Sequence, residues 1–227
     1  MTPGEVIRHA NWLVENASTQ AQAHAKRALS FLDYAEAVKD IIDQEPQVVT
    51  KAPFDFQQFA QSFRQLRDKY EDEVRRDPMC IYKPAHGVAL EFHTSTAFVR
   101  YFRGGNRISK TESAAADNYW MVTGQHPHRS TPLLPCSVFI IGVNFSKYGQ
   151  SVFEKKYLTG EEGNPLSPVF PEDGKWFNKY DNKKHIIYLA CPECAATGKN
   201  GSCKHLKSTI TLFSDTEGPT VLAGGQY

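Results

Sequence analysis

Residues 98–124 read FVRYFRGGNRISKTESAAADNYWMVTG, and this stretch decides the fold that the sequence predicts. The apolar run at 98–102 predicts a β-strand, and residues 112–122 predict a helix that ends at the next glycine. Between them lie two glycines, followed by Lys110 and Thr111 at the start of the helix. A strand, a glycine-rich turn and a helix that opens with Lys-Thr form the local structure of a phosphate-binding loop.

The residue types between 104 and 111 suit a triphosphate. Glycines tolerate the backbone dihedrals that point N–H groups into a concavity, and the positive end of the following helix favours an anion. Lys110 would reach the β- and γ-phosphates, and the hydroxyl of Thr111 would hold Mg²⁺. Ser109 stands where the general pattern has glycine, but serine is small enough for a variant loop. The predicted ATP-binding residues are Gly104, Gly105, Asn106, Arg107, Ile108, Ser109, Lys110 and Thr111.

Arg107 has two interpretations that the sequence leaves open. Its guanidinium could stabilise the charge that builds up on the γ-phosphate during hydrolysis, which would make it catalytic together with Lys110. It could equally be a solvated residue of the loop.

The segments on either side of the loop predict two regions. Residues 1–84 are predicted to be helical, with a capping box at Thr2 and Glu5 and helices at 3–16, 19–43 and 54–76. Residues 85–227 are predicted to form an α/β domain, with further strands at 137–143, 185–190 and 208–213, a helix at 148–158 and a loop at 159–173. The predicted fold class is α/β, a P-loop nucleotide-binding domain with a parallel sheet and helices, preceded by a helical N-terminal region.

Four metal-ligating side chains lie close together near the C-terminus. Cys191, Cys194, Cys203 and His205 follow a Cys-x2-Cys-x8-Cys-x-His spacing, which is short enough to surround one tetrahedral zinc ion. A closed set of four protein ligands implies a structural Zn²⁺, here in a zinc-knuckle hairpin inserted at 190–206. Free thiols near a surface histidine are the alternative.

Composition limits the partners and the cellular location that we expect for the chain. The 26 basic and 25 acidic residues give a net charge of +1, so any nucleic-acid contact must be local. No apolar run approaches the roughly 20 residues of a membrane span, and the N-terminus lacks the features of a signal peptide, so we expect a cytoplasmic protein with no membrane partner. The other conspicuous side chains are predicted to be ordinary buried thiols at Cys80 and Cys136 and an ordinary polar loop at His126 and His128.

The region around the glycine-rich loop resembles a known family. The string Phe92-His93-Thr94-Ser95, Arg100, the residues 103–112 and the later 123–127 are similar to the start of the ATPase domain in the large terminase subunits of tailed bacteriophages, which package DNA into procapsids. The run 210–225 follows the same order of features, so the resemblance covers about residues 88–227. It implies that Lys110 and Thr111 bind phosphate and magnesium, that Arg107 is an arginine sensor, and that residues 92–95 lie near the adenine.

The resemblance also implies partners and a setting. The expected partners are ATP, double-stranded DNA, the terminase small subunit and the portal or procapsid, with further copies of the chain in an oligomer, inside an infected or lysogenic bacterial cell. A motor ATPase further needs an acidic pair at the end of an apolar strand, and no predicted strand ends in a clear one; Asp215 and Glu217 are weak candidates. In the resembled family that pair and a nuclease domain would follow beyond residue 227, so we expect a partial ATPase domain and leave hydrolysis by this chain open.

The alternative function comes from a different class. It is a non-enzymatic zinc-containing module that binds DNA or a packaging partner and retains the phosphate loop as a relic.

Overall fold

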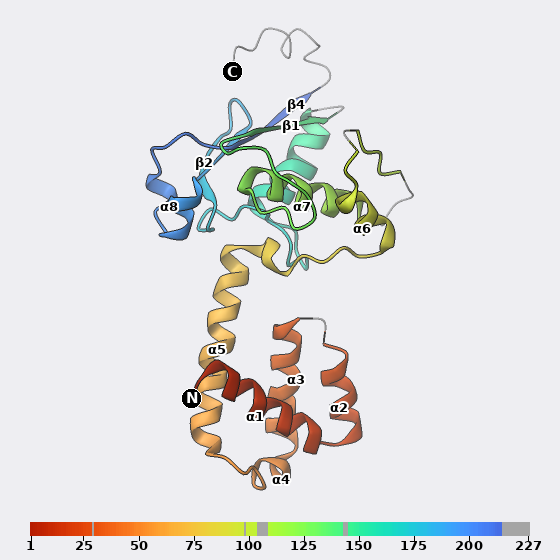
Figure 1. The fold of residues 1–227 in the computed structure, drawn as a ribbon, viewed down its shortest axis with the longest axis vertical. Helices are drawn as coiled ribbons and strands as arrows, with labels where there is room; N and C mark the ends of the chain where they lie inside the picture. The colour runs from red at the N-terminus through yellow and green to blue at the C-terminus, as the bar shows by residue number, and fades with distance from the viewer. Residues whose placement is uncertain (29, 98, 104–108, 143–144, 215–227) are drawn as a thin grey trace. The chain divides into compact units, whose positions relative to one another are not determined.

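The computed structural model describes residues 1–28, 30–97, 99–103, 109–142 and 145–214. The chain divides into two compact units, Met1–Val74 and Arg75–Tyr227, and each has its own hydrophobic core (Figure 1). The division falls inside the long helix α5 (Phe56–Arg76), ahead of residue 84, where the sequence analysis ends the helical region.

The first unit is helical, as predicted. It contains α1 (Pro3–Asn16), α2 (Thr19–Lys26), α3 (Phe31–Gln44), α4 (Pro46–Val49) and most of α5. The capping box at the start of α1 is confirmed: the Thr2 amide donates to Glu5 Oε2 at 2.7 Å, and the Glu5 amide donates to Thr2 Oγ1 at 3.3 Å. The apolar faces meet in a core that includes Val6, Leu13, Val38, Ile41, Phe59 and Phe63.

The prediction of one helix over 19–43 is wrong, because two helices, α2 and α3, occupy that range. Ser30 and Asp33 form a second capping box, in which the Asp33 amide donates to Ser30 Oγ at 3.1 Å and the Ser30 amide donates to Asp33 Oδ2 at 3.0 Å. These bonds satisfy the amides at the start of a new helix, so α3 begins at Phe31.

The second unit is mixed α/β, which confirms the predicted class at that level. Its helical elements are η1 (Pro78–Ile81), α6 (Gly87–Thr94), α7 (Lys110–Thr123), the π-helix η2 (Phe145–Thr159), α8 (Pro192–Ala196) and η3 (Asn200–Ser202). Its sheet has the order β1-β4-β3-β2, made by β1 (Ser137–Gly142), β4 (Thr209–Ser214), β3 (Ile186–Leu189) and β2 (Phe177–Asp181).

The sheet is mixed and not purely parallel. β1 and β4 pair in parallel, with Val138 opposite Ile210, whereas β3 pairs antiparallel with both β4 and β2. The strand β2 was not predicted, because its sequence, FNKYD, has three polar residues and no apolar run. One side of the sheet packs with α7 and η2 in a core that includes Ala115, Tyr119, Phe153, Ile187, Leu189 and Ile210.

The strand predicted at 98–102 is also wrong for the residues that the structure describes there. Residues 99–102 have no regular secondary structure, and the side chains of Val99 and Tyr101 are 77% and 88% exposed. The Arg100 side chain explains the path of this segment, because it donates to the Phe92 carbonyl at 2.8 Å and to the Asp117 carboxylate. The segment is thus tied by a charged side chain to α6 and α7.

The end of α7 agrees with the prediction, whereas the burial of Cys80 and Cys136 does not. α7 ends at Gly124, as predicted, because this glycine adopts the left-handed conformation (φ 73°) and donates its amide to the Trp120 carbonyl. The thiols are less buried than predicted: Cys80 is exposed and Cys136 is half-buried.

Candidate metal centre and phosphate-binding loop

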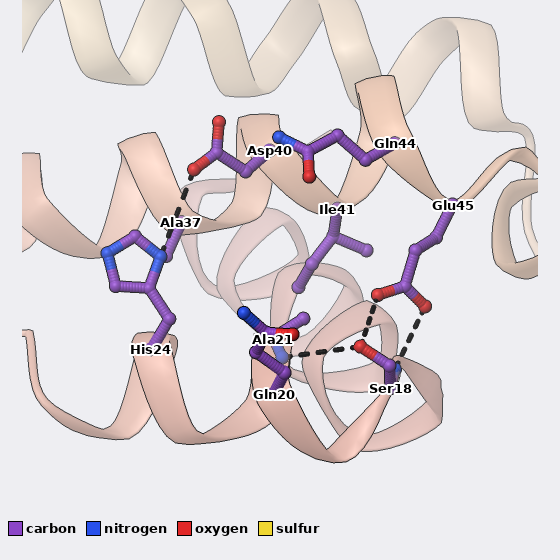
Figure 2. A pocket seen from close by; sticks show the side chains of 9 residues that line it. All are labelled: Ser18, Gln20, Ala21, His24, Ala37, Asp40, Ile41, Gln44 and Glu45. Carbon is purple, nitrogen blue, oxygen red and sulfur yellow. Dashed lines mark hydrogen bonds and ion pairs between the residues drawn. The ribbon is translucent and has the colours of Figure 1, made fainter.

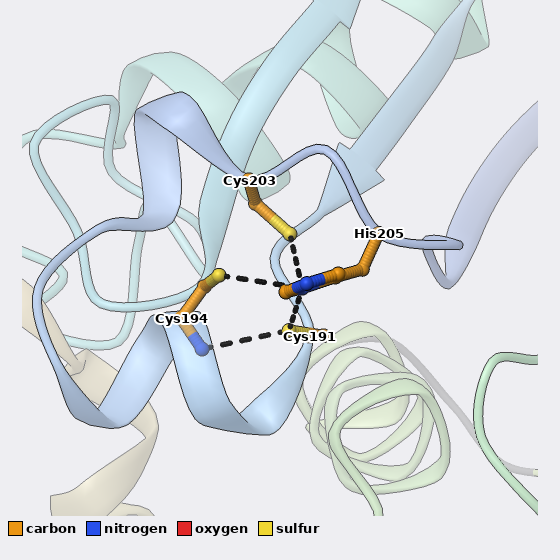
Figure 3. Close-up of side chains that lie close together, drawn as sticks. All are labelled: Cys191, Cys194, Cys203 and His205. Atoms are coloured by element: carbon orange, nitrogen blue, oxygen red, sulfur yellow. Dashed lines mark hydrogen bonds between the residues drawn. The ribbon is translucent and has the colours of Figure 1, made fainter.

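The four predicted metal ligands converge on one point (Figure 3). His205 Nδ1 lies 3.2 Å from the sulfur of Cys191, 3.6 Å from that of Cys194 and 3.9 Å from that of Cys203, and the four ligand atoms all lie within 4.8 Å of one another. Tetrahedral zinc with bonds of about 2.3 Å to sulfur and 2.0–2.1 Å to nitrogen places these atoms about 3.6 Å apart. The four side chains therefore form a possible metal-binding group, consistent with zinc.

Local structure explains why these ligands meet. Cys191 follows β3 and is the N-cap of α8, where its sulfur accepts the Cys194 amide at 3.5 Å. Cys203 follows η3, and its side chain is buried. The strands β3 and β4 pair antiparallel at the base, with Ile187 opposite Ile210, so the hairpin brings both halves of the ligand set together.

The same contacts alter the proton affinities of the ligands. Burial opposes ionisation of Cys203, but hydrogen bonds from the backbone of Cys191 and His205 outweigh it and lower the pKa of this thiol to about 7. A thiolate is the form that binds metal, and hydrogen bonds to sulfur stabilise it.

The phosphate loop lies only partly within the described chain. Five of its predicted residues, Gly104, Gly105, Asn106, Arg107 and Ile108, fall outside the described residues. Ser109 is the N-cap of α7 in the left-handed conformation (φ 55°), and Lys110 and Thr111 form the first turn. The Ser109 side chain makes no capping bond to that turn, unlike Thr2, Ser18 and Ser30 at the starts of α1, α2 and α3.

A partly buried ion pair lies next to Thr111 in the first turn of α7. Glu112 accepts a hydrogen bond from the fully buried ammonium group of Lys156 and a second from Asn164 Nδ2 at 2.8 Å. Lys156 therefore neutralises the carboxylate nearest the start of α7, which would otherwise repel a phosphate there.

A second cluster surrounds Asp117 on α7, and sequence reasoning missed it. Arg100 binds the carboxylate with both terminal nitrogens, at 3.1 and 2.7 Å, and Arg129 Nη2 donates to it at 2.6 Å. His93 Nδ1 and His126 Nε2 lie 3.4 and 3.2 Å from the same Oδ1 atom. The Asp117 cluster (His93, Arg100, Asp117, His126 and Arg129) thus joins three segments that are distant in the sequence.

The expectation of an ordinary polar loop at 126–128 is wrong for His126, whose side chain is fully buried beside a carboxylate. Local sequence offers no sign of this, because Asp117 lies nine residues away on a helix. The group His93, Asp117 and His126 is compact enough to hold a metal ion, but two guanidinium groups already occupy both carboxylate oxygens and would repel a cation. We interpret the cluster as an ion-pair anchor.

The Asp117 cluster borders a cavity of about 270 Å³, whose lining includes Arg100. Its lining combines aromatic side chains with a carboxylate and a hydroxyl and includes Glu91, Phe92, Ser95, Arg100 and Phe102. Phe92 and Phe102 stack with ring centroids 5.3 Å apart, and the Arg100 guanidinium lies 4.5 Å from the centre of the Phe92 ring. The cavity wall therefore combines stacked aromatic rings with a guanidinium group.

Another cavity, of about 250 Å³, lies between α2 and α3 in the helical unit (Figure 2). Glu45 accepts hydrogen bonds from the amide and hydroxyl of Ser18, at 2.9 and 2.7 Å, and His24 Nδ1 lies 3.8 Å from Asp40 Oδ2. Two carboxylates in the lining make this cavity unsuitable for a nucleotide phosphate.

Comparison with known proteins adds no family. The chain matches no protein-family model, no curated protein and no solved structure. No helix among the described residues has both the length and the apolar character that a membrane crossing requires.

Proposed function

We propose that the chain is the nucleotide-binding portion of a phage DNA-packaging terminase large subunit and that the loop 104–111 binds ATP with Mg²⁺. The observation that carries the proposal is the start of α7, where Lys110 and Thr111 occupy the first turn directly after the glycine-rich sequence. Backbone N–H groups at the start of a 14-residue helix favour an anion, and Ser109 does not cap them with its side chain.

Each part of the nucleotide has residues that suit it. Lys110 would neutralise the β- and γ-phosphates, and the Thr111 hydroxyl would bind the magnesium ion that screens them. The stacked rings of Phe92 and Phe102 would hold the base, in agreement with the adenine position that the terminase resemblance implies. No strand precedes the loop at residues 99–102. Instead, Arg100 in this segment pairs with Asp117 on α7, the helix that follows the loop.

The proposal is tested by comparing Lys110→Ala with Lys183→Ala, which removes an equal charge from an exposed turn. Affinity for Mg-ATP is measured by isothermal titration calorimetry. We expect Lys110→Ala to weaken binding at least tenfold, about 1.4 kcal/mol, and Lys183→Ala to leave it unchanged. A parent protein without ATP affinity, or equal affinities in the two variants, would contradict the proposal.

We also propose that the four-ligand group binds one structural Zn²⁺. Three thiols and one imidazole complete a tetrahedral shell, which leaves no position for a substrate, so the ion would pin the hairpin and stabilise the fold. Elemental analysis should find about one zinc per chain, lost in Cys194→Ser and retained in the control Cys80→Ser, whose thiol is exposed. Metal-free parent protein of unchanged stability would refute the zinc assignment.

The second candidate function is a zinc-containing module that binds DNA or a packaging partner without using ATP. The convergence of Cys191, Cys194, Cys203 and His205 supports it equally well. Zinc in a parent protein that does not bind ATP would favour this candidate.

A further inference from the structure

Charge is distributed unevenly along the chain. Residues 1–74 hold 12 Asp and Glu against 8 Lys and Arg, a net charge of −4, and residues 75–227 hold 18 basic against 13 acidic residues, a net charge of +5. The segment 175–207 alone holds seven lysines against Asp181 and Glu193, which is also +5. The excess positive charge of the second unit therefore lies in β2, β3 and the metal-binding hairpin.

The lysines of this segment border the metal centre. Lys199 and Lys204 are exposed and Lys207 is half-buried, and these three lysines flank Cys203 and His205 in the sequence. A zinc ion bound by the four proposed ligands would hold this part of the chain in place, so the backbone positions of these lysines would be fixed before any partner binds. A preorganised surface loses less conformational entropy on binding.

The hairpin and β2 form one continuous structure. Asn200 Nδ2 donates to the carbonyls of Gly174 and Phe177, at 2.6 and 2.9 Å, and Asn178 Nδ2 donates to the Asn200 carbonyl at 2.6 Å. Lys179 on β2 is exposed, and its ammonium group lies 4.6 Å from the centre of the Tyr188 ring on β3. These contacts hold the metal hairpin against β2, the edge strand of the sheet, on which Lys179 lies.

Nearby acids do not cancel this charge. Asp181 accepts the backbone amides of Lys183 and Lys184 with one oxygen, at 3.1 Å each, and Glu193 lies in the first turn of α8. Within the described part of the chain, no carboxylate lies within 4.0 Å of the ammonium groups of Lys199, Lys204 or Lys207. Their positive charge is therefore available to an external anion.

We propose that this lysine surface (Lys179, Lys199, Lys204 and Lys207) binds the phosphate backbone of double-stranded DNA without reading its sequence. Lysines supply point charges to phosphates, and the segment 175–207 contains no arginine that could bind a guanine edge with two hydrogen bonds. The choice of DNA rests on the proposed function, whereas the electrostatic attraction does not require ATP. An anionic membrane is less suitable, because Leu206 is the single large apolar side chain with high exposure among the described residues of this segment.

The test measures binding of a fluorescent 30-base-pair duplex by anisotropy at several salt concentrations, without nucleotide. The variant is Lys199→Gln/Lys204→Gln/Lys207→Gln, and the matched control is Lys26→Gln/Lys39→Gln/Lys51→Gln, which removes three exposed charges from the acidic unit. Log K falls with log salt concentration with a slope of about −0.9 per phosphate contact, so loss of three contacts should make the slope less negative by about 2–3. Its affinity should fall at least tenfold, with the control within about twofold of the parent.

Further variants separate this proposal from the proposed function. Lys110→Ala should bind DNA like the parent, so loss of ATP binding alone leaves the lysine surface supported. If the triple variant loses its zinc, Lys179→Gln, which lies outside the metal hairpin, should still make the slope less negative by about 0.9. The proposal is overturned if the parent does not bind DNA at 50 mM salt, if variant and control bind equally, or if lysine-dependent binding occurs only to phosphatidylserine vesicles.

Discussion

Replacing Asp117 by asparagine removes one charge from the most densely connected ion pair of the described chain and leaves the shape of the side chain unchanged. Arg100 and Arg129 both donate to its carboxylate at 3.1 Å or less, and His93 and His126 contact it at 3.4 and 3.2 Å. Burial alone would raise the pKa of Asp117, but the bonds from His93, Arg100 and His126 hold it well below its usual value. The carboxylate is therefore ionised at every ordinary pH.

The expected cost follows from burial. Removing one member of a buried ion pair typically costs about 3–5 kcal/mol, because the remaining charge stays buried without a counter-ion. The side chains are 9% exposed for Asp117, 15% for Arg100 and 16% for Arg129, so water can partly hydrate both guanidinium groups. We therefore expect the lower end, about 3 kcal/mol, which corresponds to a fall of about 6–12 °C in Tm for a protein of this size.

Urea denaturation of the parent and of Asp117→Asn, followed by tryptophan fluorescence, measures this loss in the free energy of unfolding. One of the three tryptophans, Trp120, lies with its ring 4.9 and 5.0 Å from the rings of His93 and His126 and so contributes a signal from the cluster. Glu162→Gln, at an exposed position, is the control for loss of one negative charge and should change stability by less than about 0.5 kcal/mol. A loss below about 1 kcal/mol in Asp117→Asn would refute the interpretation of the cluster as an anchor.

Two further predictions concern acid stability and the end of α7. Burial is the largest influence on His126 and lowers its pKa below the ordinary 6.5. Protonation of His126 therefore favours the unfolded chain. The stability that this group contributes is complete above pH 6.5 and declines as the pH falls below it. Urea titrations at pH 7.5 and 5.5 should show a drop that His126→Asn reduces, and an equal drop in the variant would exclude this origin. Gly124→Ala should lower the free energy of unfolding by about 1–2 kcal/mol in thermal denaturation, because φ is 73° and a Cβ would lie 3.0 Å from Leu134 Cδ1. The control Gly87→Ala, with open space around the added Cβ, should be nearly neutral. Equal stabilities of the two alanine variants would contradict this reasoning.

Short-range patterns predicted the features whose chemistry is local. The capping box at Thr2 and Glu5 links residues three apart, and the four metal ligands lie within 15 residues. The helix that opens at Lys110 and ends at Gly124 likewise needs only its own terminal residues. In each case the interacting groups are so close in the chain that few other arrangements compete, which is why periodicity and spacing sufficed.

Tertiary structure decided the features that depend on distant partners. Residues 98–102 have strand-like composition, yet residues 99–102 form no strand, and the Arg100 guanidinium pairs instead with a buried carboxylate on α7. His126 and Asp117 are paired by the folding of α7 against the following loop, and the polar strand β2 exists because β3 offers it a partner. The sequence by itself determined the start of α1, the end of α7 and which side chains could bind a metal. Long-range electrostatics and strand pairing, whose free energy appears only when remote segments meet, determined the path of residues 99–102, the Asp117 cluster and the strand β2.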